Sequence, residues 1–585
     1  MEISTGSTKQ KRSQLRLPSS RGEPPAVRWP RLFHALQEGV FSYVDVALAE
    51  KLLSHTDNPS EEAAGFLCYL SRATRQGHVC VSVEGSDVAP PPFDEGTAEV
   101  LQAAGLSVPQ GAAALPLSLV TEVDRWSEPV PSTPLCRCGH RYYFQKYWVD
   151  ESLFFKQLSR LRSSEPALPL RVDKKQMEGL NAEQMQAVHC FSKNSLTLIC
   201  GGPGTGKTYT AGQLIKIFWD SLSADQRKRC EIALAAPTGK AAANLHKSLH
   251  NAIGSLKEFP AIQSKTLHAL MGRQTAKQLT ADLILVDECS MVDLHLMAQF
   301  LSSIKKGARV ALIGDPFQLP PVEVGAPFAD VVSSGHPCLA QHLVTINTCV
   351  RTERQELLDF AKAIQEGCVE KVFNLLASSV DIEFLDNEKD ILSRAFSAFP
   401  SPSFCGQNPK GILESFHHFR LLSPLRKGPF GVDNMNQRLL QHMKKWIKKD
   451  QWLAPIMITS NNYGMELFNG DVGVLVCSPS TTQINDDEYA LFPSHNKGVR
   501  KIPARVLPAY DYAYCLSVHK SQGCEFDSVL LLMPEGSEHI GREGLYTAAT
   551  RTRKKLAIWG DRATIAKTLE RNSRRQSGVA HLIAL

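Results

Sequence analysis

Residues 196–208 read Leu-Thr-Leu-Ile-Cys-Gly-Gly-Pro-Gly-Thr-Gly-Lys-Thr. The first five residues form an apolar run typical of a strand buried in a parallel sheet, and residues 209–218 continue as a helical stretch. The glycines between them let successive backbone N–H groups turn inward, where they and the helix N-terminus can bind phosphate oxygens. The order of strand, glycine-rich loop and helix therefore predicts a nucleoside-triphosphate site on an α/β fold.

This loop supplies most of the expected nucleotide contacts. Lys207 would place its charge on the β- and γ-phosphates, and the Thr208 hydroxyl would be a Mg²⁺ ligand. The expected contacts within the loop are Gly201, Gly202, Pro203, Gly204, Thr205, Gly206, Lys207 and Thr208. The alternative, a glycine turn that only caps a helix, is disfavoured because a strand and a helix stand directly on either side.

Two adjacent acids follow another apolar run, since residues 283–288 read Leu-Ile-Leu-Val-Asp-Glu. Asp287 would hold Mg²⁺ through water, and Glu288 would orient or deprotonate the attacking water. Acids at strand ends are common, but a pair downstream of a phosphate loop predicts triphosphate hydrolysis. The sequence has no Asn-Lys-x-Asp motif for reading guanine, which favours ATP.

Short apolar runs, each followed by a turn residue and a helical stretch, recur from about residue 166 onward. This alternation predicts parallel α/β sheets that are buried on both faces. The runs are Leu196–Cys200, Ile232–Ala236, Leu283–Val286, Val310–Ile313, Phe419–Leu422, Val529–Met533 and Leu556–Trp559. They fall into two groups, so we expect two α/β domains, over residues 166–338 and 339–585.

A different pattern interrupts the second group. Residues 452–505 contain short strands, at Ile456–Thr459, Val472–Cys477 and Val499–Pro503, and turn residues without a helical period. This pattern predicts a small β-rich insertion at about 440–508 in the second α/β domain.

The N-terminal part of the chain shows no chemical constellation. Residues 1–31 hold seven Lys or Arg against two Glu, so they carry +5 of the formal charge of +6. We expect residues 1–30 to be a disordered basic tail, with an organelle transit peptide as the alternative. Residues 31–165 are expected to form a mainly helical domain. We interpret its cluster Cys136-Arg-Cys138-Gly-His140 as a turn with two buried thiols; a metal site is the alternative, although no second Cys/His pair would complete it.

The composition excludes several classes of protein. Of the 585 residues, 43% are hydrophobic and 21% charged, which is typical of a soluble globular protein and excludes collagen, a coiled coil and wholesale disorder. The sequence contains no run of about 18 uncharged apolar residues, so it predicts no transmembrane helix. Fifteen cysteines without regular spacing indicate reduced thiols in a cytosolic setting. Because the body beyond residue 31 is nearly neutral, we expect any nucleic acid to bind in a local groove.

The motifs together resemble superfamily 1 helicases and, more narrowly, the RecD family, the alpha subunits of the RecBCD exodeoxyribonuclease V. Superfamily motifs are similar at residues 201–208, 236–243, 266–270, 286–293, 314–322, 517–527 and 545–553. RecD-like runs lie at residues 76–80, 422–436 and 467–473. The resemblance covers residues 180–560 strongly and 31–165 weakly.

The resemblance implies a 5′-to-3′ helicase that translocates on single-stranded DNA. It implies two RecA-like domains with ATP between them and a small barrel insertion, like Src-homology-3 domains, in the second. It also implies RecB-like and RecC-like partner subunits, in a bacterial cytoplasmic complex that unwinds and degrades DNA ends for double-strand-break repair by homologous recombination. We find no nuclease constellation, so we expect any nuclease on a partner chain, and we expect the N-terminal domain to dock on the partners.

Four further residues take roles from the motif set. Gln184 resembles the adenine-reading Q element; an isolated glutamine there would usually be an exposed polar residue, but within the motif set we favour a contact to adenine. Gln318 would sense the γ-phosphate; its alternative is filler in a Pro-rich turn. Arg551 and Arg351 are the expected arginine fingers, since a guanidinium fork matches phosphate oxygens. The residues before Arg351 depart from the aromatic that the family usually places there.

DNA contacts are expected from loops at the sheet edges, where hydroxyls, amides and cations can hold phosphates without reading sequence. The candidates are Pro237, Thr238, Lys240, Thr266, His268, Thr459, Asn461, His519, Lys520 and Ser521. The alternative for the two histidines is a core position. Phe317, Phe328 and Phe468 are possible stacking platforms, with core packing as their alternative.

Two other functions stay open. A stand-alone RecD-like helicase is disfavoured because residues 31–165 are too short for the tandem helix-hairpin-helix modules of such proteins. A P-loop scaffold that binds nucleotide without hydrolysis is disfavoured because Lys207, the acid pair and the arginine finger are all present.

Overall fold

The computed structural model describes residues 28–91, 95–124, 130–253, 264–272, 278–348, 355–399, 408–445, 452–477, 488–494 and 498–579. These residues form two compact units. The N-terminal unit comprises residues up to 76 together with 80–123 and 131–145, and the C-terminal unit comprises residues 77–79, 124–130 and 146 onward. Within the described part of the chain, no helix is long and apolar enough to cross a membrane.

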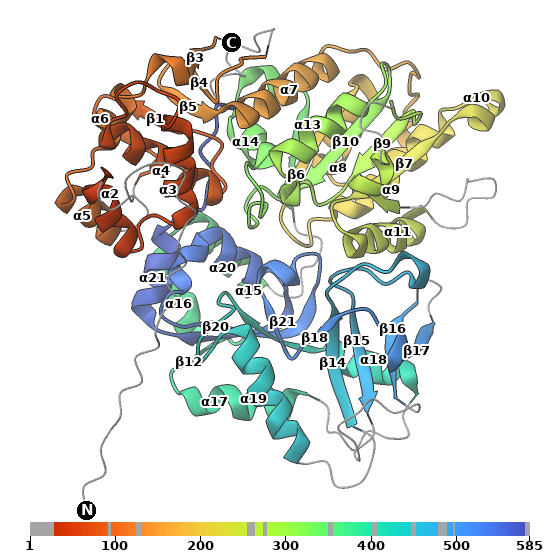
Figure 1. The fold of residues 1–585 in the computed structure, drawn as a ribbon. Coiled ribbons are helices and arrows are strands. Elements are labelled where there is room, and N and C mark those ends of the chain that lie inside the picture. The colour runs from red at the N-terminus through yellow and green to blue at the C-terminus, as the bar shows by residue number, and fades with distance from the viewer. Residues whose placement is uncertain are drawn as a thin grey trace, which may run out of the picture. The chain divides into compact units, whose positions relative to one another are not determined.

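The N-terminal unit packs helices against a small sheet (Figure 1). Helix α4 lies at the centre of this unit, because most of its residues are buried. The Ser60 side chain caps its N-terminus. The helices are α2 (Pro30–Gln37), α3 (Tyr43–Leu53), α4 (Glu61–Arg75), α5 (Glu95–Ala103) and α6 (Val108–Ala113). The strands, in sheet order, are β2 (Asp87–Ala89), β1 (Val81–Glu84), β5 (Arg141–Phe144), β4 (Leu135–Cys138) and β3 (Val120–Glu122).

This unit corrects two expectations. The sequence predicted its helices but not its five-stranded sheet, since strands of three or four residues carry little pattern. The predicted disordered tail is wrong at its end, because Trp29 is buried in the core and α2 begins at Pro30; residues 1–27 lie outside the described residues. The buried-thiol interpretation is confirmed, since Cys136 and Cys138 are buried on β4 and Gly139 makes the turn into β5 with φ +59°.

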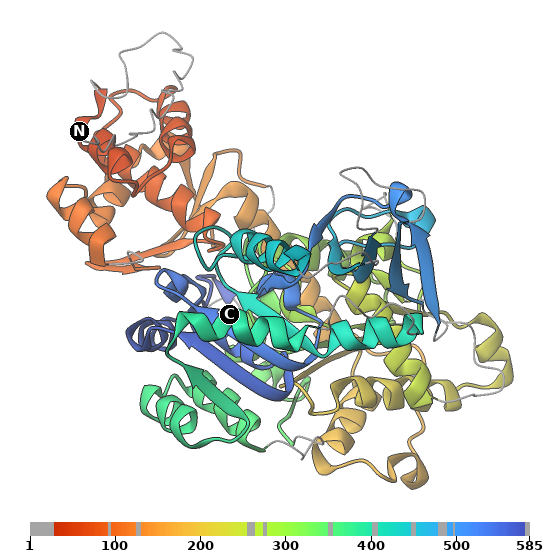
Figure 2. The same cartoon turned by 90° about the horizontal axis from the view of Figure 1, so that it is seen from below.

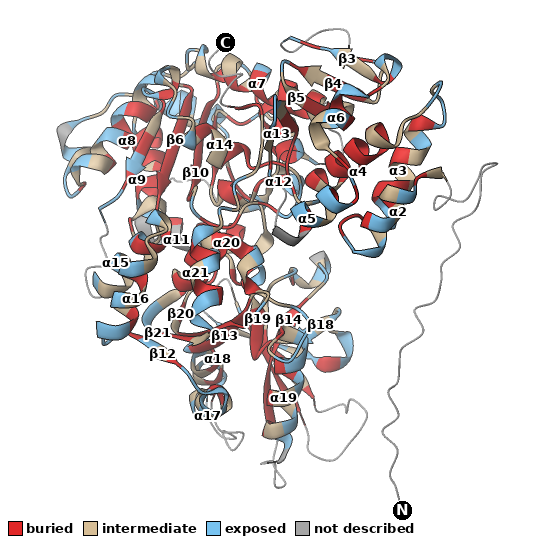
Figure 3. Cartoon of the chain, turned by 90° about the vertical axis from the view of Figure 1, so that its left-hand side faces the viewer, coloured by how far each residue is buried: buried red, intermediate tan, exposed pale blue. Residues whose placement is uncertain are grey.

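The first sheet of the C-terminal unit is entirely parallel. Its strands, in order, are β11 (Leu343–Ile346), β6 (Leu196–Gly201), β10 (Arg309–Gly314), β9 (Leu283–Val286), β7 (Ile232–Ala236) and β8 (Ser264–Thr266). The central strands β6, β10 and β9 are buried throughout, as Figure 3 shows for β6 and β10. The main helices around it are α8 (Ala182–Lys193), α9 (Lys207–Asp220), α11 (Gly239–Ile253) and α13 (Leu294–Ser303).

Shorter elements complete this half of the unit. They are α7 (Gln145–Arg162), α10 (Ala224–Arg229), α12 (Leu267–Met271) and α14 (Pro327–Ser333). The four predicted strands are confirmed, and β8 and β11 are additional. Strand β11 lies beyond residue 338, where we placed the end of the first domain, yet it pairs with β6 in this sheet. Helix α7 likewise falls in the C-terminal unit and not in the N-terminal one, apart from its first residue.

A second parallel sheet lies farther along the chain. Its strands, in order, are β12 (Ile382–Leu385), β21 (Thr552–Gly560), β20 (Phe526–Met533), β13 (Phe419–Ser423) and β19 (Cys515–Ser517). Its helices are α15 (Gln355–Glu366), α16 (Val369–Ser378), α17 (Glu388–Ala398), α18 (Pro409–His417), α19 (Val432–Lys445), α20 (Gly541–Ala549) and α21 (Arg562–Glu570). The three predicted strands are confirmed, so the C-terminal unit holds two parallel α/β sheets.

An antiparallel sheet is inserted between β13 and β19 (Figures 1 and 2). Its strands, in order, are β17 (Val499–Pro503), β16 (Tyr489–Pro493), β15 (Val472–Cys477), β14 (Trp452–Ile458) and β18 (Tyr510–Tyr512). The predicted β-rich insertion is thus present, and it extends slightly past residue 508 to Tyr512.

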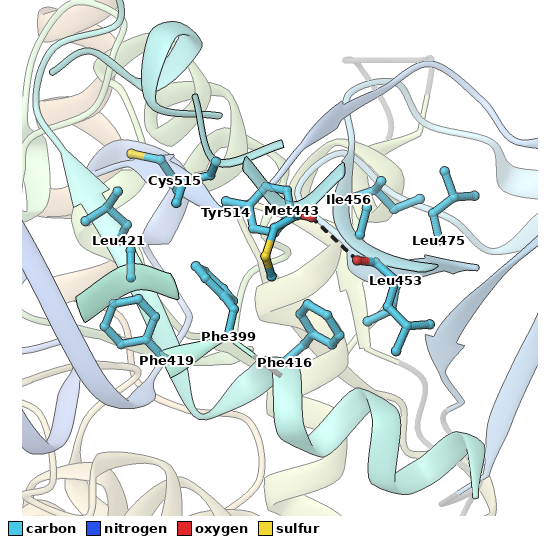
Figure 4. Close-up of a cluster of buried hydrophobic side chains, with 14 of the residues drawn as sticks. Phe399, Phe416, Phe419, Leu421, Met443, Leu453, Ile456, Leu475, Tyr514 and Cys515 are labelled. Atoms are coloured by element: carbon cyan, nitrogen blue, oxygen red, sulfur yellow. Dashed lines mark hydrogen bonds between the residues drawn. The ribbon is translucent and has the colours of Figure 1, made fainter. Parts of the chain in front are cut away.

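The insertion shares its hydrophobic core with the second parallel sheet (Figure 4). The Phe399 ring meets Phe419 on β13 and Tyr514 edge-on, at centroid distances of 5.2 and 5.1 Å. The Tyr514 hydroxyl donates to the Leu453 carbonyl on β14 at 3.5 Å. Because one continuous apolar cluster joins the two sheets, the insertion is held firmly on the second domain.

Candidate nucleotide site

The phosphate loop connects the buried strand β6 to helix α9. Gly204 and Gly206 have φ values of +76° and +83°, a region that favours glycine. A Cβ on Gly201 would lie 2.4 Å from the Ile346 carbonyl oxygen of β11. These glycines are therefore required by the backbone turn and by the close approach of the neighbouring strand.

Lys207, the first residue of α9, folds its ammonium group over this loop. Its Nζ donates to the carbonyls of Gly201 and Gly202 at 2.7 and 2.8 Å, and the Thr205 hydroxyl also donates to Gly202 at 2.9 Å. The ammonium thus lies at the mouth of the loop, where a phosphate would replace these carbonyls as its partner. Thr208 follows on the first turn of α9 and is half-buried.

The acid pair stands at the end of β9. The Asp287 carboxylate accepts from the Glu288 backbone N–H at 2.8 Å, and Glu288 has a left-handed φ of +55°, a conformation that is costly for a non-glycine residue and is often found at active sites. Burial and then the Asp287 charge raise the pKa of Glu288 to about 7, against the opposing charges of Arg551 and Lys207. Burial also raises the pKa of Asp287.

A third acid, Asp315, completes the site and was not among the predicted residues. It follows β10, is fully buried, and accepts from the Phe317 backbone N–H at 3.1 Å. Burial raises its pKa, and the charge of Lys207 opposes that rise. Lys207 therefore acts electrostatically on three carboxyl groups at once, which brings the loop, the acid pair and Asp315 into one site.

Gln318 points into this site from the loop after β10. Only 6% of the residue is exposed. Its Nε2 donates to Asp315 Oδ2 at 3.3 Å, and its Oε1 is buried without a hydrogen-bond partner among the described residues. A buried amide with an unused acceptor is costly unless water or a ligand satisfies it, and the role of Gln318 as a γ-phosphate sensor stays a prediction.

Arg551 follows α20 and approaches the acid pair from the second parallel sheet. The residue is 4% exposed, and its guanidinium donates to the carbonyls of Thr547 and Cys524 at 3.0 and 3.2 Å. Its charge opposes the raised pKa of Glu288. The side chain is thus both near the predicted catalytic acid and part of the local structure.

Two predicted nucleotide residues receive less support. Gln184 is the third residue of α8 and forms a capping box with Asn181: each side-chain oxygen accepts from the other residue's backbone N–H, at 2.8 and 3.1 Å. Helix capping therefore accounts for its conformation, leaving its amide NH₂ group for an adenine edge. Arg351 lies outside the described residues.

Comparisons with known proteins name the family. Residues 37–143 match the family described as RecBCD enzyme subunit RecD, N-terminal domain; residues 179–387 match an AAA domain; and residues 512–559 match a UvrD-like helicase C-terminal domain. The RecBCD enzyme subunit RecD of Mycobacterium tuberculosis is 30% identical over 93% of this chain and 95% of its own length. The chain belongs to the RecD family.

This RecD-family chain is also similar to two proteins whose names describe them as helicases. The ATP-dependent RecD2 DNA helicase of Deinococcus radiodurans is 26% identical, over 80% of this chain and 62% of that protein. The structure of the Pif1 helicase from Bacteroides in complex with ADP-AlF3 and single-stranded DNA is 18% identical, with a TM-score of 0.39, over 67% of this chain and 94% of that one.

The predicted DNA contacts of the RecD-family chain in the first domain lie at strand ends. Pro237 and Thr238 follow β7, and the Thr238 hydroxyl accepts from the Ala241 backbone N–H at 3.2 Å. Thr266 caps α12 by accepting from the Ala269 backbone N–H, and His268 on that helix is exposed and not in the core.

Lys240 is engaged with the second domain. Its Nζ lies 2.7 Å from the Cys524 sulfur, and Asn244 one turn later donates to the Gly523 carbonyl at 2.8 Å. A Cβ on Gly239 would lie 2.7 Å from the Phe468 ring of the antiparallel sheet's loop. The start of α11 is thus covered by residues of the second domain in this conformation.

The candidates in the second domain divide into accessible and buried side chains. Asn461, His519 and Lys520 are exposed, and Thr459 is half-buried. Ser521 is fully buried and its hydroxyl donates to the Val518 carbonyl at 2.7 Å. The prediction of a DNA contact at Ser521 is therefore wrong for this structure, because its hydroxyl closes a short helical turn. Among the possible platforms, Phe328 is also buried in the core, whereas 42% of Phe317 is exposed.

Proposed function

We propose that this RecD-family chain is the ATP-driven motor of a RecBCD-type complex and moves 5′ to 3′ along single-stranded DNA. The chain is an ATP-dependent DNA helicase, as its family membership and its helicase domains establish. The observation that carries the proposal is the convergence of Lys207, Glu288, Gln318 and Arg551 from two parallel sheets on one site. A site shared by two domains can convert hydrolysis into relative domain movement.

Each residue of the site has a distinct task. Lys207 and the loop N–H groups bind the triphosphate, and Gln318 offers its unpartnered Oε1 and its amide to the γ-phosphate region. Glu288, with its pKa raised to about 7, is suited to hold or take a proton from the attacking water. Arg551 neutralises charge that develops on the transferred phosphoryl group.

A Mg²⁺ ion fits the donors present. The Thr208 hydroxyl and the Asp287 carboxylate are oxygen ligands of the kind Mg²⁺ prefers, and both side chains are half-buried. When bound, Mg²⁺ would neutralise phosphate charge. The Thr208 hydroxyl would bind it directly and Asp287 through water.

The sheets support a domain assignment of the C-terminal unit. The first RecA-like domain includes β11, and the second begins after it and carries the antiparallel insertion, which we assign as the small barrel expected for the family. We assign DNA binding to Pro237, Thr238, Lys240, Thr266 and His268 in the first domain. The second domain contributes Thr459, Asn461, His519 and Lys520.

The match of residues 37–143 to the RecD N-terminal domain supports a role in docking on RecB-like and RecC-like subunits. The complex would process DNA ends in the bacterial cytoplasm during recombinational repair, with any nuclease on a partner. A stand-alone helicase is the second candidate, because the chain also matches RecD2; that match covers 62% of RecD2, against 95% of the mycobacterial RecD.

The test is ATP hydrolysis by the purified chain, with and without single-stranded DNA and then with its partner subunits. We expect DNA to stimulate turnover and Lys207→Gln to abolish it. Lys216→Gln on the same helix α9 is the matched control and should behave as the parent chain. Absence of hydrolysis by the folded chain, even with partners, would refute the motor and favour the nucleotide-binding scaffold.

A further inference from the structure

Helix α20 reaches the nucleotide site through a residue other than Arg551. Tyr546 is 2% exposed, and its hydroxyl donates to Asp315 Oδ2 at 3.0 Å. The Gln365 side chain hydrogen-bonds the same hydroxyl. A Cβ on Gly202 would lie 3.2 Å from this oxygen. Tyr546, from the second domain, therefore places a polar group directly against the phosphate loop of the first.

The acceptor of this bond is shared with the predicted γ-phosphate sensor. Asp315 Oδ2 also accepts from Gln318 Nε2, at 3.3 Å, while Oδ1 accepts from the Phe317 backbone N–H. Asp315 is fully buried, so water does not compete for these oxygens. The hydroxyl of Tyr546 and the amide of Gln318 thus meet on one carboxylate oxygen, and the position of each depends on the other.

The next residue of α20 ties the same loop to the arginine finger. The Thr547 hydroxyl accepts from the Leu319 backbone N–H at 2.8 Å. The Thr547 carbonyl in turn accepts from Arg551 Nε at 3.0 Å. Two consecutive residues of α20 therefore link the loop that carries Gln318 to the side chain of Arg551.

We propose that Tyr546 is a positioning residue that couples Gln318 to Arg551 by holding Asp315. This inference rests on the proposed function, in which Gln318 senses the γ-phosphate and Arg551 stabilises the transition state. A triphosphate that draws the Gln318 amide toward itself leaves Asp315 Oδ2 to Tyr546, which keeps α20 and Arg551 against the site. Movement of the second domain along DNA is transmitted to the nucleotide by the same contact.

The test is Tyr546→Phe in the full chain, together with its partner subunits where turnover requires them. The substitution removes only the hydroxyl and retains the ring, which packs edge-on against Phe317 at 6.3 Å. We expect the kcat of DNA-stimulated ATP hydrolysis to fall about ten-fold, while KM for ATP changes less than about two-fold. The reason is that the lost hydrogen bond to the Asp315 carboxylate stabilises the transition state more than it stabilises bound ATP.

Tyr514→Phe is the matched control, because it removes another buried tyrosine hydroxyl, whose bond to Leu453 belongs to the hydrophobic core that the antiparallel sheet shares with the second parallel sheet (Figure 4). Its kcat should equal that of the parent chain. Asp315→Asn tests the route: if Tyr546 acts through Asp315, the double variant should be no slower than the slower single variant.

Three results would overturn the coupling: an unchanged kcat in Tyr546→Phe, a rise in KM that accounts for the whole loss, or additive effects of the two substitutions. An inactive parent chain, tested with its partners, is a different outcome. It would refute the proposed function itself, and this inference with it.

Discussion

Replacement of Arg551 by alanine separates the catalytic from the structural role of this side chain. An arginine finger accelerates phosphoryl transfer by about 10³–10⁵, equivalent to roughly 4–7 kcal/mol of barrier. Arg551 acts electrostatically on Glu288 at the acid pair and comes from the opposite domain. We therefore expect Arg551→Ala to lower kcat by about three orders of magnitude or more, with ATP affinity retained because Lys207 and the loop are untouched.

The hydrogen bonds of Arg551 predict a second, smaller effect. The guanidinium donates to the carbonyls of Thr547 and Cys524. In the alanine variant the buried Cys524 carbonyl loses this donor, which costs about 1–3 kcal/mol, whereas the Thr547 carbonyl still accepts from the Thr550 hydroxyl; the variant should therefore also unfold at lower temperature. Arg551→Lys keeps the charge and one donor but loses the planar fork, so it should recover part of the stability and little of the turnover.

The assay measures three quantities on the parent chain and both variants: kcat with saturating single-stranded DNA, the Kd of a fluorescent ATP analogue, and the midpoint of thermal unfolding. Turnover of the alanine variant within about ten-fold of the parent would refute the finger assignment. Loss of ATP binding in step with loss of stability would show that Arg551 serves only to support the fold.

Three further predictions follow from single contacts. Gly201→Ala should abolish ATP-analogue binding, because its Cβ would lie 2.4 Å from the Ile346 carbonyl oxygen; normal affinity would contradict this. Burial and Arg575 lower the pKa of His78 to about 3, and its Nδ1 accepts from the Gln576 backbone N–H. The contact therefore requires neutral His78. When the contact is broken, the histidine has a pKa near 6.5 and gains a proton as the pH falls, so the contact should weaken by about 1.4 kcal/mol between pH 7.5 and 5.5. If this contact weakens, trypsin should cleave within residues 571–579 faster at pH 5.5 than at pH 7.5, and the His78→Asn variant should not show this pH dependence. A cleavage rate in the parent chain that does not depend on pH would contradict the prediction. Asp45→Asn should destabilise the N-terminal unit by about 2–3 kcal/mol, because this buried carboxylate accepts from the Arg75 guanidinium; unchanged hydrogen exchange in α3 and α4 would disprove it.

The predicted strands of the two parallel sheets share one property, which is that most of their residues are buried; the half-exposed strand Val499–Pro503 was instead predicted from a segment with turn residues and no helical period. Such strands are uninterrupted apolar runs, so Ile232–Ala236 and Leu283–Val286 were located to the residue. Strands β8 and β18 were missed, because Ser264–Thr266 and Tyr510–Tyr512 are short, half-exposed and polar. Their conformation depends on the neighbouring strand that offers hydrogen bonds, and this neighbour is distant in sequence.

The sequence alone determined the phosphate loop, the acid pair and the family, because glycine conformation, strand burial and motif order are local properties of the chain. Only the tertiary structure decided that Ser521 is buried, that Gln184 caps a helix, and that Asp315 and Tyr546 join the site. The last two are separated by 231 positions. Their contact depends on how two sheets pack, and packing is set by the combined shape of many side chains, which no spacing along the sequence records.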